Sequence, residues 1–412
     1  MIGHRTIKKI QKGFKEKKRN IDNFFIRKFS FPIVYHIHAL APIKKDKVIF
    51  VEPKGQVVTE NYELLIDKLN KDYNLDVKVH FLMEKSGVGW EEHTRRRFEF
   101  LKDAATASFL IYSFPNDLYG SFKPRKGTKV MNTWHGCGAF KKFGFSTVDK
   151  GFGRSSFQQH LYHVHPDYDL VPVSSKEIEW VYIEAMGQNK NPSCVKGIGV
   201  SRTDVFYQQD FIDKSKSHLN QLLNEKNRNK KVLLYAPTFR GGIAHSKTPN
   251  ELNISELYNA LKDDYIILLK YHPLVKKRYR PEIPSECSNF ALDMTDDMTI
   301  SELLCAADIC ITDYSSLIFE YSLLDRPLLF FAYDLDEYDT ERGFYYNYKD
   351  MVPGPICKTT AELIDNINKL PESFDVEKNN AFKKKFMSGC DGHATERIIS
   401  EFFGDAIEPF RK

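Results

Sequence analysis

Short runs of apolar, often β-branched residues alternate along the chain with segments whose apolar residues recur every three or four positions. In the first half, this pattern predicts strands at residues 48–51, 77–82, 109–112, 129–132 and 169–173, and helices at 60–69, 93–105 and 175–186. Strands that alternate with helices in this way are typical of a parallel sheet with crossover helices. Residues 46–205 are therefore predicted to form one doubly wound, Rossmann-like domain.

The same alternation returns in the second half, after a glycine-containing, apolar-poor stretch at 197–204 and a polar helix rich in Lys and Asn. We interpret that stretch as a domain boundary. The later pattern predicts strands at 231–236, 265–270, 308–312 and 328–331, and helices at 254–261, 300–307, after Ser315, at 361–370 and at 393–403. Residues 206–412 are predicted to form a second Rossmann-like domain with terminal helices, and folds of this type bind ligands at the carboxyl ends of their strands.

The composition is typical of a folded globular protein. Of 412 residues, 42% are hydrophobic and 28% are charged, and the length allows two or three domains. The seven cysteines are scattered and lack paired CxxC spacing, which favours a reducing compartment over a disulfide framework or a zinc module. No run of about 7 to 15 apolar residues marks a signal peptide. Charged residues, histidines and Pro32 interrupt residues 24–43, so no transmembrane helix is predicted.

Basic residues are concentrated at the N-terminus. The net charge of +5 is too small to indicate nucleic acid binding, and no nucleic-acid-binding motif accompanies it. Within the first 30 residues, the basic side chains are Arg5, Lys8, Lys9, Lys12, Lys15, Lys17, Lys18, Arg19, Arg27 and Lys28, and the recurring apolar ones are Ile7, Ile10, Phe14, Ile21, Phe24 and Phe25. This pattern predicts that residues 1–45 form a basic amphipathic segment that lies on anionic lipid. A solvated tail, or a helix packed on its own domain, fits the pattern equally well.

Two serines follow a predicted strand directly. The apolar run 308–312 ends at Asp313-Tyr314, and Ser315 and Ser316 then begin an amphipathic helix. Backbone N–H groups at such a helix start bind phosphate. The alternative is that one serine is only an N-cap, for which Ser is a favoured residue. Glu320, one turn into the helix, is in a position to point toward the ligand.

Basic side chains and histidines follow three other strands. His135 comes after strand 129–132 and is flanked by glycine, Arg240 follows strand 231–236, and Lys270 with His272 ends strand 265–270. Together they predict recognition of a diphosphate plus one general base. The remaining histidines lack carboxylates at ligand spacing, so no metal site is predicted.

The motifs that carry these residues resemble a known family. They are TWHG, YAPTFR, LKYHP, ITDYSSLIFEYSLLDRPLLFF, YDLDEY and RGFY. In this order, over residues 45–400, they resemble the CDP-glycerol glycerophosphotransferase family of teichoic acid primases and polymerases. The resemblance implies a GT-B-like fold, a peripheral location on the cytoplasmic face of the cell membrane, and a CDP-glycerol or CDP-ribitol donor.

The resemblance also implies roles for single residues. It makes His135 the catalytic base and His272 the residue that stabilises phosphate charge. It assigns Ser315 and Ser316 to the donor phosphates and Glu320 to the neighbourhood of the polyol hydroxyls. With Arg240 and Lys270 at the strand ends and Arg342 of the RGFY motif, these residues make up the predicted donor site. One departure concerns the acceptor side: many members follow TWHG with Thr-Pro-Leu-Lys-Lys, whereas this chain continues with Cys137-Gly138-Ala139-Phe140-Lys141-Lys142.

The expected reaction is in-line attack by a hydroxyl of a lipid-linked acceptor on the phosphorus that carries the polyol, with release of CMP. No Walker-type loop or aspartate cluster is visible, so no obligatory ion or cofactor is expected, although a divalent cation could stimulate the reaction. A GT-B glycosyltransferase that uses a nucleotide sugar is the nearest alternative. A non-catalytic scaffold that binds anionic polymer or lipid is a weaker one, because His135 and His272 are both present. The sequence leaves open the polyol, the oligomeric state, and whether one unit or many are added.

Overall fold

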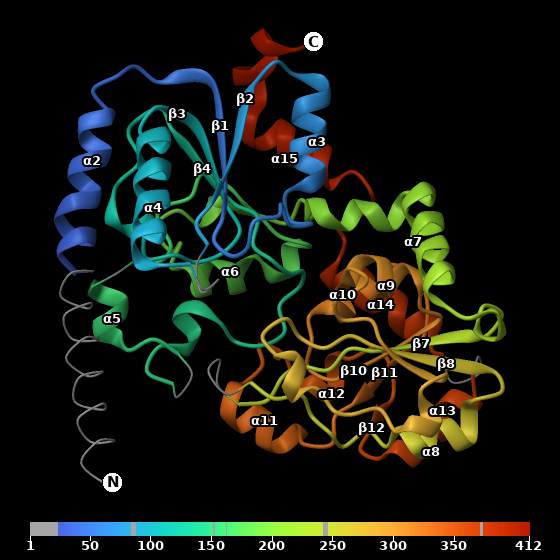
Figure 1. Cartoon of the computed structure of the whole chain (residues 1–412). Coiled ribbons are helices and arrows are strands. Elements are labelled where there is room, and N and C mark those ends of the chain that lie inside the picture. The colour runs from blue at the N-terminus through green and yellow to red at the C-terminus, as the bar shows by residue number, and fades with distance from the viewer. Residues whose placement is uncertain (1–23, 84–87, 151–152, 162, 242–245, 371–373) are drawn as a thin grey trace, which may run out of the picture. The chain divides into compact units, whose positions relative to one another are not determined.

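Each of the two units into which the chain divides is built around a parallel β-sheet (Figure 1). Unit 1 consists of Met1–His135, Ser155–Val171 and Ile399–Lys412, and unit 2 of Gly136–Arg154 and Pro172–Ile398. The computed structural model describes residues 24–83, 88–150, 153–161, 163–241, 246–370 and 374–412. The prediction of an α/β fold with parallel sheets is confirmed.

The sheet of unit 1 has the strand order β2-β1-β3-β4. Its strands are β1 (Lys44–Glu52), β2 (Asp76–Phe81), β3 (Ala107–Tyr112) and β4 (Lys129–Asn132). In β1, Val48 pairs with Val77 on one side and with Phe109 on the other. The continuous apolar run of β1 is buried, as expected for a central parallel strand that is covered on both faces.

Aromatic residues pack helices of unit 1 against one another and against a neighbouring loop. The helices are α2 (Phe31–His38), preceded by the π-helix η1 (Ile26–Ser30), α3 (Glu63–Asp72), α4 (Trp90–Ala104) and α5 (Ser156–Leu161). Phe31 of α2 meets Phe98 of α4 with ring centroids 5.3 Å apart, and Tyr35 stacks on Phe122 at 4.4 Å. Most of the predicted amphipathic segment, residues 1–23, lies outside the described residues, whose helices include none long and apolar enough to cross a membrane.

The sheet of unit 2 has six parallel strands in the order β12-β11-β10-β7-β8-β9. They are β7 (Lys231–Tyr235), β8 (Tyr265–Leu269), β9 (Ala291–Asp293), β10 (Ile309–Thr312), β11 (Leu328–Phe331) and β12 (Ile356–Cys357). Its main helices are α6 (Glu179–Met186), α7 (Gln209–Leu222), α8 (Ile254–Leu261), α9 (Ile300–Ala306), α10 (Leu317–Ser322), α11 (Leu335–Arg342), α12 (Tyr348–Met351), α13 (Thr360–Asn368) and α14 (Val376–Phe386). The short strands β5 (Val171–Pro172) and β6 (Val195–Lys196) pair separately.

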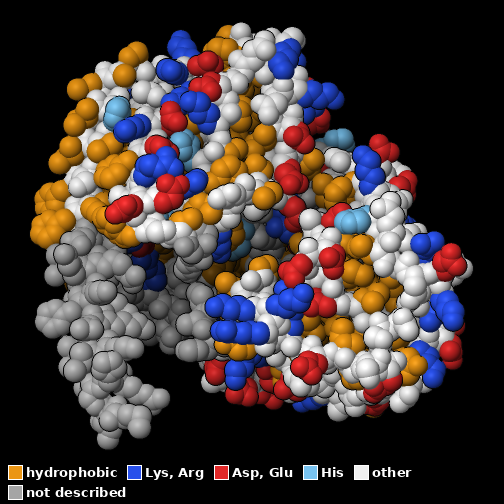
Figure 2. Space-filling view, in the orientation of Figure 1, with side chains coloured by type: hydrophobic (Ala, Val, Ile, Leu, Met, Phe, Trp, Pro, Cys, Tyr) orange, Lys and Arg blue, Asp and Glu red, His pale blue; other side chains and the backbone are white. Residues whose placement is uncertain are grey.

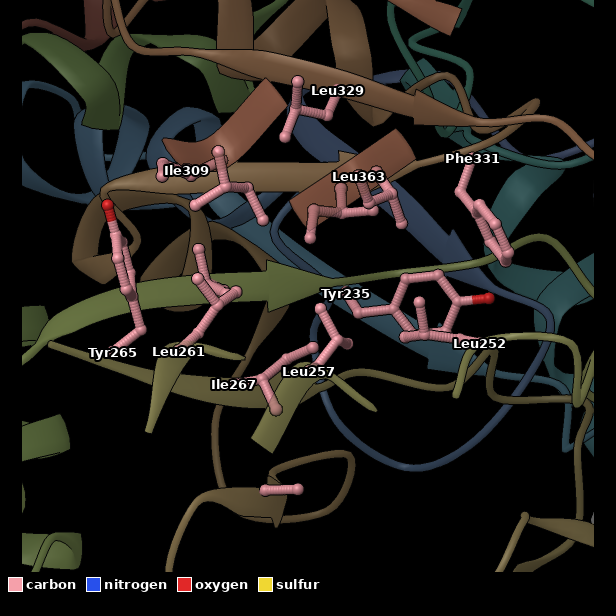
Figure 3. Packing of buried hydrophobic residues seen from close by; sticks show 14 of the residues in the cluster. Tyr235, Leu252, Leu257, Leu261, Tyr265, Ile267, Ile309, Leu329, Phe331 and Leu363 are labelled. Atoms are coloured by element: carbon pink, nitrogen blue, oxygen red, sulfur yellow. The ribbon is translucent and has the colours of Figure 1, made fainter. Parts of the chain in front are cut away.

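One face of the unit 2 sheet forms a large apolar core (Figure 3). Alternate strand residues such as Leu233, Ile267 and Ile311 point to this face, where Leu257 of α8 and Leu363 of α13 cover them. The strand residues in between point to the opposite face, where α9 and α10 lie against the sheet. With both faces covered, the carboxyl ends of the strands are where polar side chains gather.

Predicted and observed elements agree best where an apolar run has clear ends. The helix at 254–261 and the strands at 129–132 and 328–331 have the predicted bounds. The strand predicted at 169–173 shrinks to Val171–Pro172, since a proline has no N–H with which to extend a ladder. The prediction omitted β9 and β12, which have three and two residues.

Residues 197–204, predicted as the domain boundary, are built into unit 2, so the predicted division at residue 205 falls inside this unit. The segment leads into the 3₁₀ helix η6 (Ser201–Tyr207), where Asp204 is buried. The Asp204 carboxylate accepts hydrogen bonds from the backbone N–H groups of Ala394 (3.1 Å) and Thr395 (2.7 Å), which begin α15 (Ala394–Phe403). An anion at this position also interacts favourably with the helix dipole.

Replacing Asp204 with Ala should therefore lower the free energy of unfolding by about 2 kcal/mol, because two buried N–H groups lose their acceptor. Urea unfolding followed by circular dichroism measures the change. Asp210→Ala, an exposed carboxylate in the first turn of α7, is the matched control and should stay within about 0.5 kcal/mol. Equal midpoints for both variants would show that α15 does not depend on Asp204.

Candidate active site

The turn after β4 is held in a strained conformation. The Thr133 N–H donates to the Tyr112 carbonyl at 2.8 Å, and the Trp134 N–H donates to the Asn132 side-chain oxygen at 2.8 Å. Trp134 has a φ of 56°, in the left-handed region that bulky residues rarely adopt. Strain of this kind persists only where neighbouring contacts enforce it, and it is concentrated at functional sites. Here it fixes the residue before His135.

His135 is half-buried in unit 1, and its tautomer is set by the backbone. Its Nδ1 lies 3.0 Å from the Ser113 carbonyl oxygen. Because a carbonyl only accepts, Nδ1 carries the hydrogen and Nε2 keeps the basic lone pair of the neutral ring. The ring stacks on Phe114 at 3.9 Å and meets Trp134 at 4.2 Å. This geometry suits the predicted role of general base at Nε2.

In unit 2, the carboxyl ends of three neighbouring strands, β10, β7 and β8, bring the predicted donor residues to one edge of the sheet. Ser315 follows β10, Arg240 follows β7, and Lys270 follows β8. The Lys270 N–H donates to the Tyr235 carbonyl of β7 at 2.9 Å, which fixes the β8 exit beside β7.

The two serines are half-buried at the start of α10. Ser315 Oγ accepts a long hydrogen bond, 3.5 Å, from the Leu317 N–H. Ser316 occupies the N-cap position, but its side chain makes no capping hydrogen bond. The N-cap interpretation therefore does not describe Ser316, and the phosphate-binding role of both serines stays a prediction.

A glycine in a left-handed conformation shapes the neighbouring loop. Gly138 has a φ of +65°, and a Cβ there would lie 2.2 Å from the Phe319 ring of α10. A Cβ on Gly136 would lie 3.3 Å from Ser316 Oγ. The segment that follows His135 in the chain therefore packs closely on the turn formed by Ser315 and Ser316, which we call the serine turn.

Glu320 is only 2% exposed and forms an ion pair inside unit 2. Its Oε1 lies 2.5 Å from Arg202 Nη2 and 3.8 Å from Cys137 Sγ. Burial, together with the Glu320 charge, raises the pKa of Cys137 well above its usual value. Sequence reasoning missed Arg202, although an acidic residue on an apolar helix indicates that a basic partner exists elsewhere. The predicted contact of Glu320 with the donor stays a prediction.

Arg240 is held by two carboxylates. Its Nε and Nη2 donate to Asp334 at 2.6 and 2.9 Å, its Nη1 lies 3.0 Å from Asp313 Oδ2, and Nη1 also donates to the Thr238 carbonyl at 2.6 Å. Burial acts to lower the pKa of Arg240, but these partners outweigh it and raise the pKa. Arg240 is thus rigidly placed beside the strand ends.

His272 presents the opposite tautomer to His135. Its Nδ1 accepts a hydrogen bond from the Leu274 N–H at 3.1 Å, so the neutral ring carries its hydrogen on Nε2. The ring lies 4.8 Å from that of Phe239. A neutral His272 can therefore donate a hydrogen bond through Nε2, as expected of a residue that stabilises phosphate charge.

Lys270 holds the loop before α9. Its Nζ donates to the carbonyls of Thr295, at 2.8 Å, and Met298.

Among the described parts of the chain, no three His, Cys, Asp or Glu side chains are grouped so that they could hold a metal ion. The need for an ion in the reaction stays untested.

Arg342, the last residue of α11, lies near a lysine that the sequence analysis did not single out. Burial is the main cause that lowers the pKa of Lys141 to about 8; the Asp313 charge opposes this shift, and the Arg342 and Arg240 charges add to it. The departure from the family pattern after TWHG pointed to this segment, but not to Lys141 itself.

The Arg202–Glu320 pair yields a stability test. Arg202→Met leaves the Glu320 carboxylate buried without its cation and should lower the free energy of unfolding by about 3 kcal/mol. The double variant Arg202→Met, Glu320→Met should lose less than Arg202→Met alone, because no uncompensated charge remains. Urea unfolding measures both. The control is Lys369→Met in the exposed pair with Asp365, expected to cost less than about 1 kcal/mol. An equal loss in Arg202→Met and Lys369→Met would contradict a structural role for the buried pair.

Known proteins resemble this chain in sequence and in fold. The family model for CDP-glycerol:poly(glycerophosphate) glycerophosphotransferase matches residues 33–404. The chain is 37% identical to the teichoic acid ribitol-phosphate primase of Bacillus spizizenii over 377 residues, which are 89% of this chain and 94% of that protein. It is 36% identical to the teichoic acid poly(ribitol-phosphate) polymerase of the same organism over 400 residues, and there it spans only 61% of the longer protein.

The fold comparison extends over nearly the whole chain. The structure of the wall teichoic acid polymerase TagF superposes with a TM-score of 0.73 at 24% identity, covering 96% of this chain and 98% of that chain. This likeness confirms the predicted GT-B-like fold. With the family model matched over most of its length, the chain belongs to the CDP-glycerol:poly(glycerophosphate) glycerophosphotransferase family.

Proposed function

We propose that this protein transfers glycerol phosphate or ribitol phosphate from a CDP-polyol to a lipid-linked acceptor of the teichoic acid type and releases CMP. The membership of the family carries this proposal, because the matched residues 33–404 include every predicted site residue. The chemistry of the strand ends supports it: hydroxyl, imidazole and cationic groups meet at one edge of the unit 2 sheet, as phosphate recognition requires.

In the proposed reaction, His135 Nε2 takes the proton of an acceptor hydroxyl. The oxygen attacks the phosphorus that carries the polyol, and the bond from this phosphorus to the bridging oxygen breaks, so CMP leaves with that oxygen. His272, through Nε2–H, and the Ser315 and Ser316 hydroxyls donate to phosphate oxygens whose charge grows during transfer. Positioning and electrostatics supply most of the rate.

The direct test is to incubate purified protein with a lipid-linked acceptor and either CDP-glycerol or CDP-ribitol, and to follow CMP release. Release with one donor and not with the other identifies the polyol. The length of the product separates a primase from a polymerase. No CMP from either donor, together with nucleoside diphosphate release from a nucleotide sugar, would replace this proposal with the glycosyltransferase alternative.

His135→Ala should lower the rate of CMP release about 10² to 10⁴-fold and leave CDP-polyol affinity nearly unchanged, because a general base acts on the acceptor hydroxyl. Steady-state kinetics and calorimetric titration measure the two effects. His163→Ala, an exposed histidine of the same unit, is the control and should retain its activity. Wild-type turnover in His135→Ala would make His135 a structural residue.

We further propose that the protein works as a peripheral protein on the cytoplasmic face of the membrane. All seven cysteines are buried and unpaired by disulfides, which fits a reducing compartment. One face of η1 and α2 is an exposed apolar row spaced four residues apart: Phe25, Phe29, Ile33 and Ile37, between 53% and 59% exposed. Figure 2 shows hydrophobic side chains gathered over α2. This row continues the basic amphipathic pattern of the preceding residues and suits insertion into a lipid interface.

Ile33→Glu with Ile37→Glu should weaken binding to vesicles that contain anionic lipid at least about tenfold, since two apolar side chains would no longer enter the lipid. Sedimentation with vesicles measures binding. Val376→Glu, an apolar residue of α14 that is 50% exposed, is the control. If the double variant sediments like the wild type, attachment uses another surface.

A further inference from the structure

Lys141 has a fixed backbone position in unit 2. It forms an isolated antiparallel bridge with Phe344. Two hydrogen bonds flank it, from the Lys142 N–H to the Gly343 carbonyl and from the Tyr345 N–H to the Phe140 carbonyl, each 3.0 Å long. Along such an extended segment, successive side chains point to opposite faces. Lys141 and Lys142 are therefore presented to different surroundings.

Three charged side chains act on the Lys141 ammonium group. Asp313 attracts its ammonium group, and Arg240 and Arg342 repel it. The two carboxylates beside Arg240 already have partners. Asp313 accepts from the Thr238 and Tyr314 N–H groups and lies beside Arg240, and Asp334 pairs with Arg240. Neither carboxylate is therefore left to pair with Lys141 alone.

Among the residues that the structure describes, no group forms a hydrogen bond or a salt bridge with the half-buried Lys141 ammonium. A charged group in such a place is destabilised by lost solvation, and an incoming anion relieves this cost. The compact charge of a lysine suits phosphate. The segment that carries Lys141 also begins at Gly136, against Ser316.

We propose that Lys141 binds the diphosphate of the CDP-polyol donor, as a further phosphate ligand beside Ser315 and Ser316. The diphosphate supplies an anionic partner for the Lys141 ammonium group. This assignment rests on the proposed function for the identity of the anion. The geometry that carries it does not depend on the reaction: the bridge to Phe344 fixes the Lys141 backbone, and within the described ranges its ammonium group has no hydrogen-bond or salt-bridge partner.

Lys141 also gives donor binding a defined pH dependence. The groups that act on it are Asp313 at the end of β10, Arg240 after β7, and Arg342 on α11. Burial raises the pKa values of the nearby Tyr314, Tyr338 and Tyr348, so these hydroxyls stay neutral near pH 8, where Lys141 loses its proton. The pKa of Lys141 is about 8 without ligand, and a bound anion raises it. Affinity is therefore full well below pH 8, and it falls as the pH rises through 8 toward the raised pKa of the complex.

The test uses CDP as the probe, because its binding needs no acceptor. Calorimetric titration at pH 7.5 should show CDP affinity at least about tenfold weaker in Lys141→Met than in the wild type, the loss of one charged contact. Lys142→Met, the neighbouring lysine on the other face, is the matched control and should stay within about twofold. Lys141→Arg, which keeps the charge, should retain most of the affinity.

A pH series from 7.5 to 9.5 excludes a merely structural role, since the phosphates of CDP stay fully ionised over this range. Wild-type affinity should fall across the series, and that of Lys141→Met should not change. Wild-type affinity in Lys141→Met, equal losses in both methionine variants, or an unchanged pH dependence would overturn the proposal. If Lys141→Met does not fold, the wild-type series and Lys141→Arg decide the question.

The result also separates this inference from the proposed function. A protein that binds CDP with the expected pattern but releases no CMP from either CDP-polyol would keep the Lys141 site and lose the reaction. A protein that releases CMP while Lys141→Met binds CDP like the wild type would keep the reaction and lose this site.

Discussion

The strand-end site of unit 2 depends on one buried carboxylate, that of Asp313. It is 1% exposed, and its Oδ1 accepts from the N–H groups of Thr238, after β7, and Tyr314, after β10. Its Oδ2 lies beside Arg240. Its backbone carbonyl also accepts from the Tyr348 hydroxyl of α12 at 3.0 Å. One side chain thereby fixes the main chain just after two parallel strands. It also holds Arg240 and the start of the serine turn in place.

The two histidines show how backbone contacts prepare a residue for a chemical role. A carbonyl beside His135 Nδ1 makes Nε2 a base, whereas an N–H beside His272 Nδ1 makes Nε2 a donor. The same side chain is thus prepared for two tasks, proton removal and charge stabilisation, by the polarity of one neighbouring main-chain group. The strained Trp134 adds rigidity before His135, because its left-handed conformation persists only while the hydrogen bonds around it hold.

The sequence predicts those features that a local residue pattern encodes. Apolar runs with polar ends gave β4, α8 and β11 with their observed bounds, and strand ends pointed to His135, Arg240 and Ser315. Strands of two or three residues, such as β9 and β12, are too short to show a period. Arg202 and Lys141 could not be found in this way, because their importance comes from partners far apart in the chain: Glu320 for the first, and the Asp313 cluster for the second.

The departure from the family pattern after TWHG has a physical explanation in Gly138. Counted from the glycine of TWHG, Gly138 stands where many members have proline. Proline cannot adopt its φ of +65°, because the proline ring fixes φ near −65°. The close approach to Phe319 also excludes any Cβ at this position. The lysine pair of the pattern occurs one residue later in this chain, as Lys141 and Lys142. The bridge to Phe344 then determines which of the two lysines faces Asp313, Arg240 and Arg342. In the observed register, that lysine is Lys141.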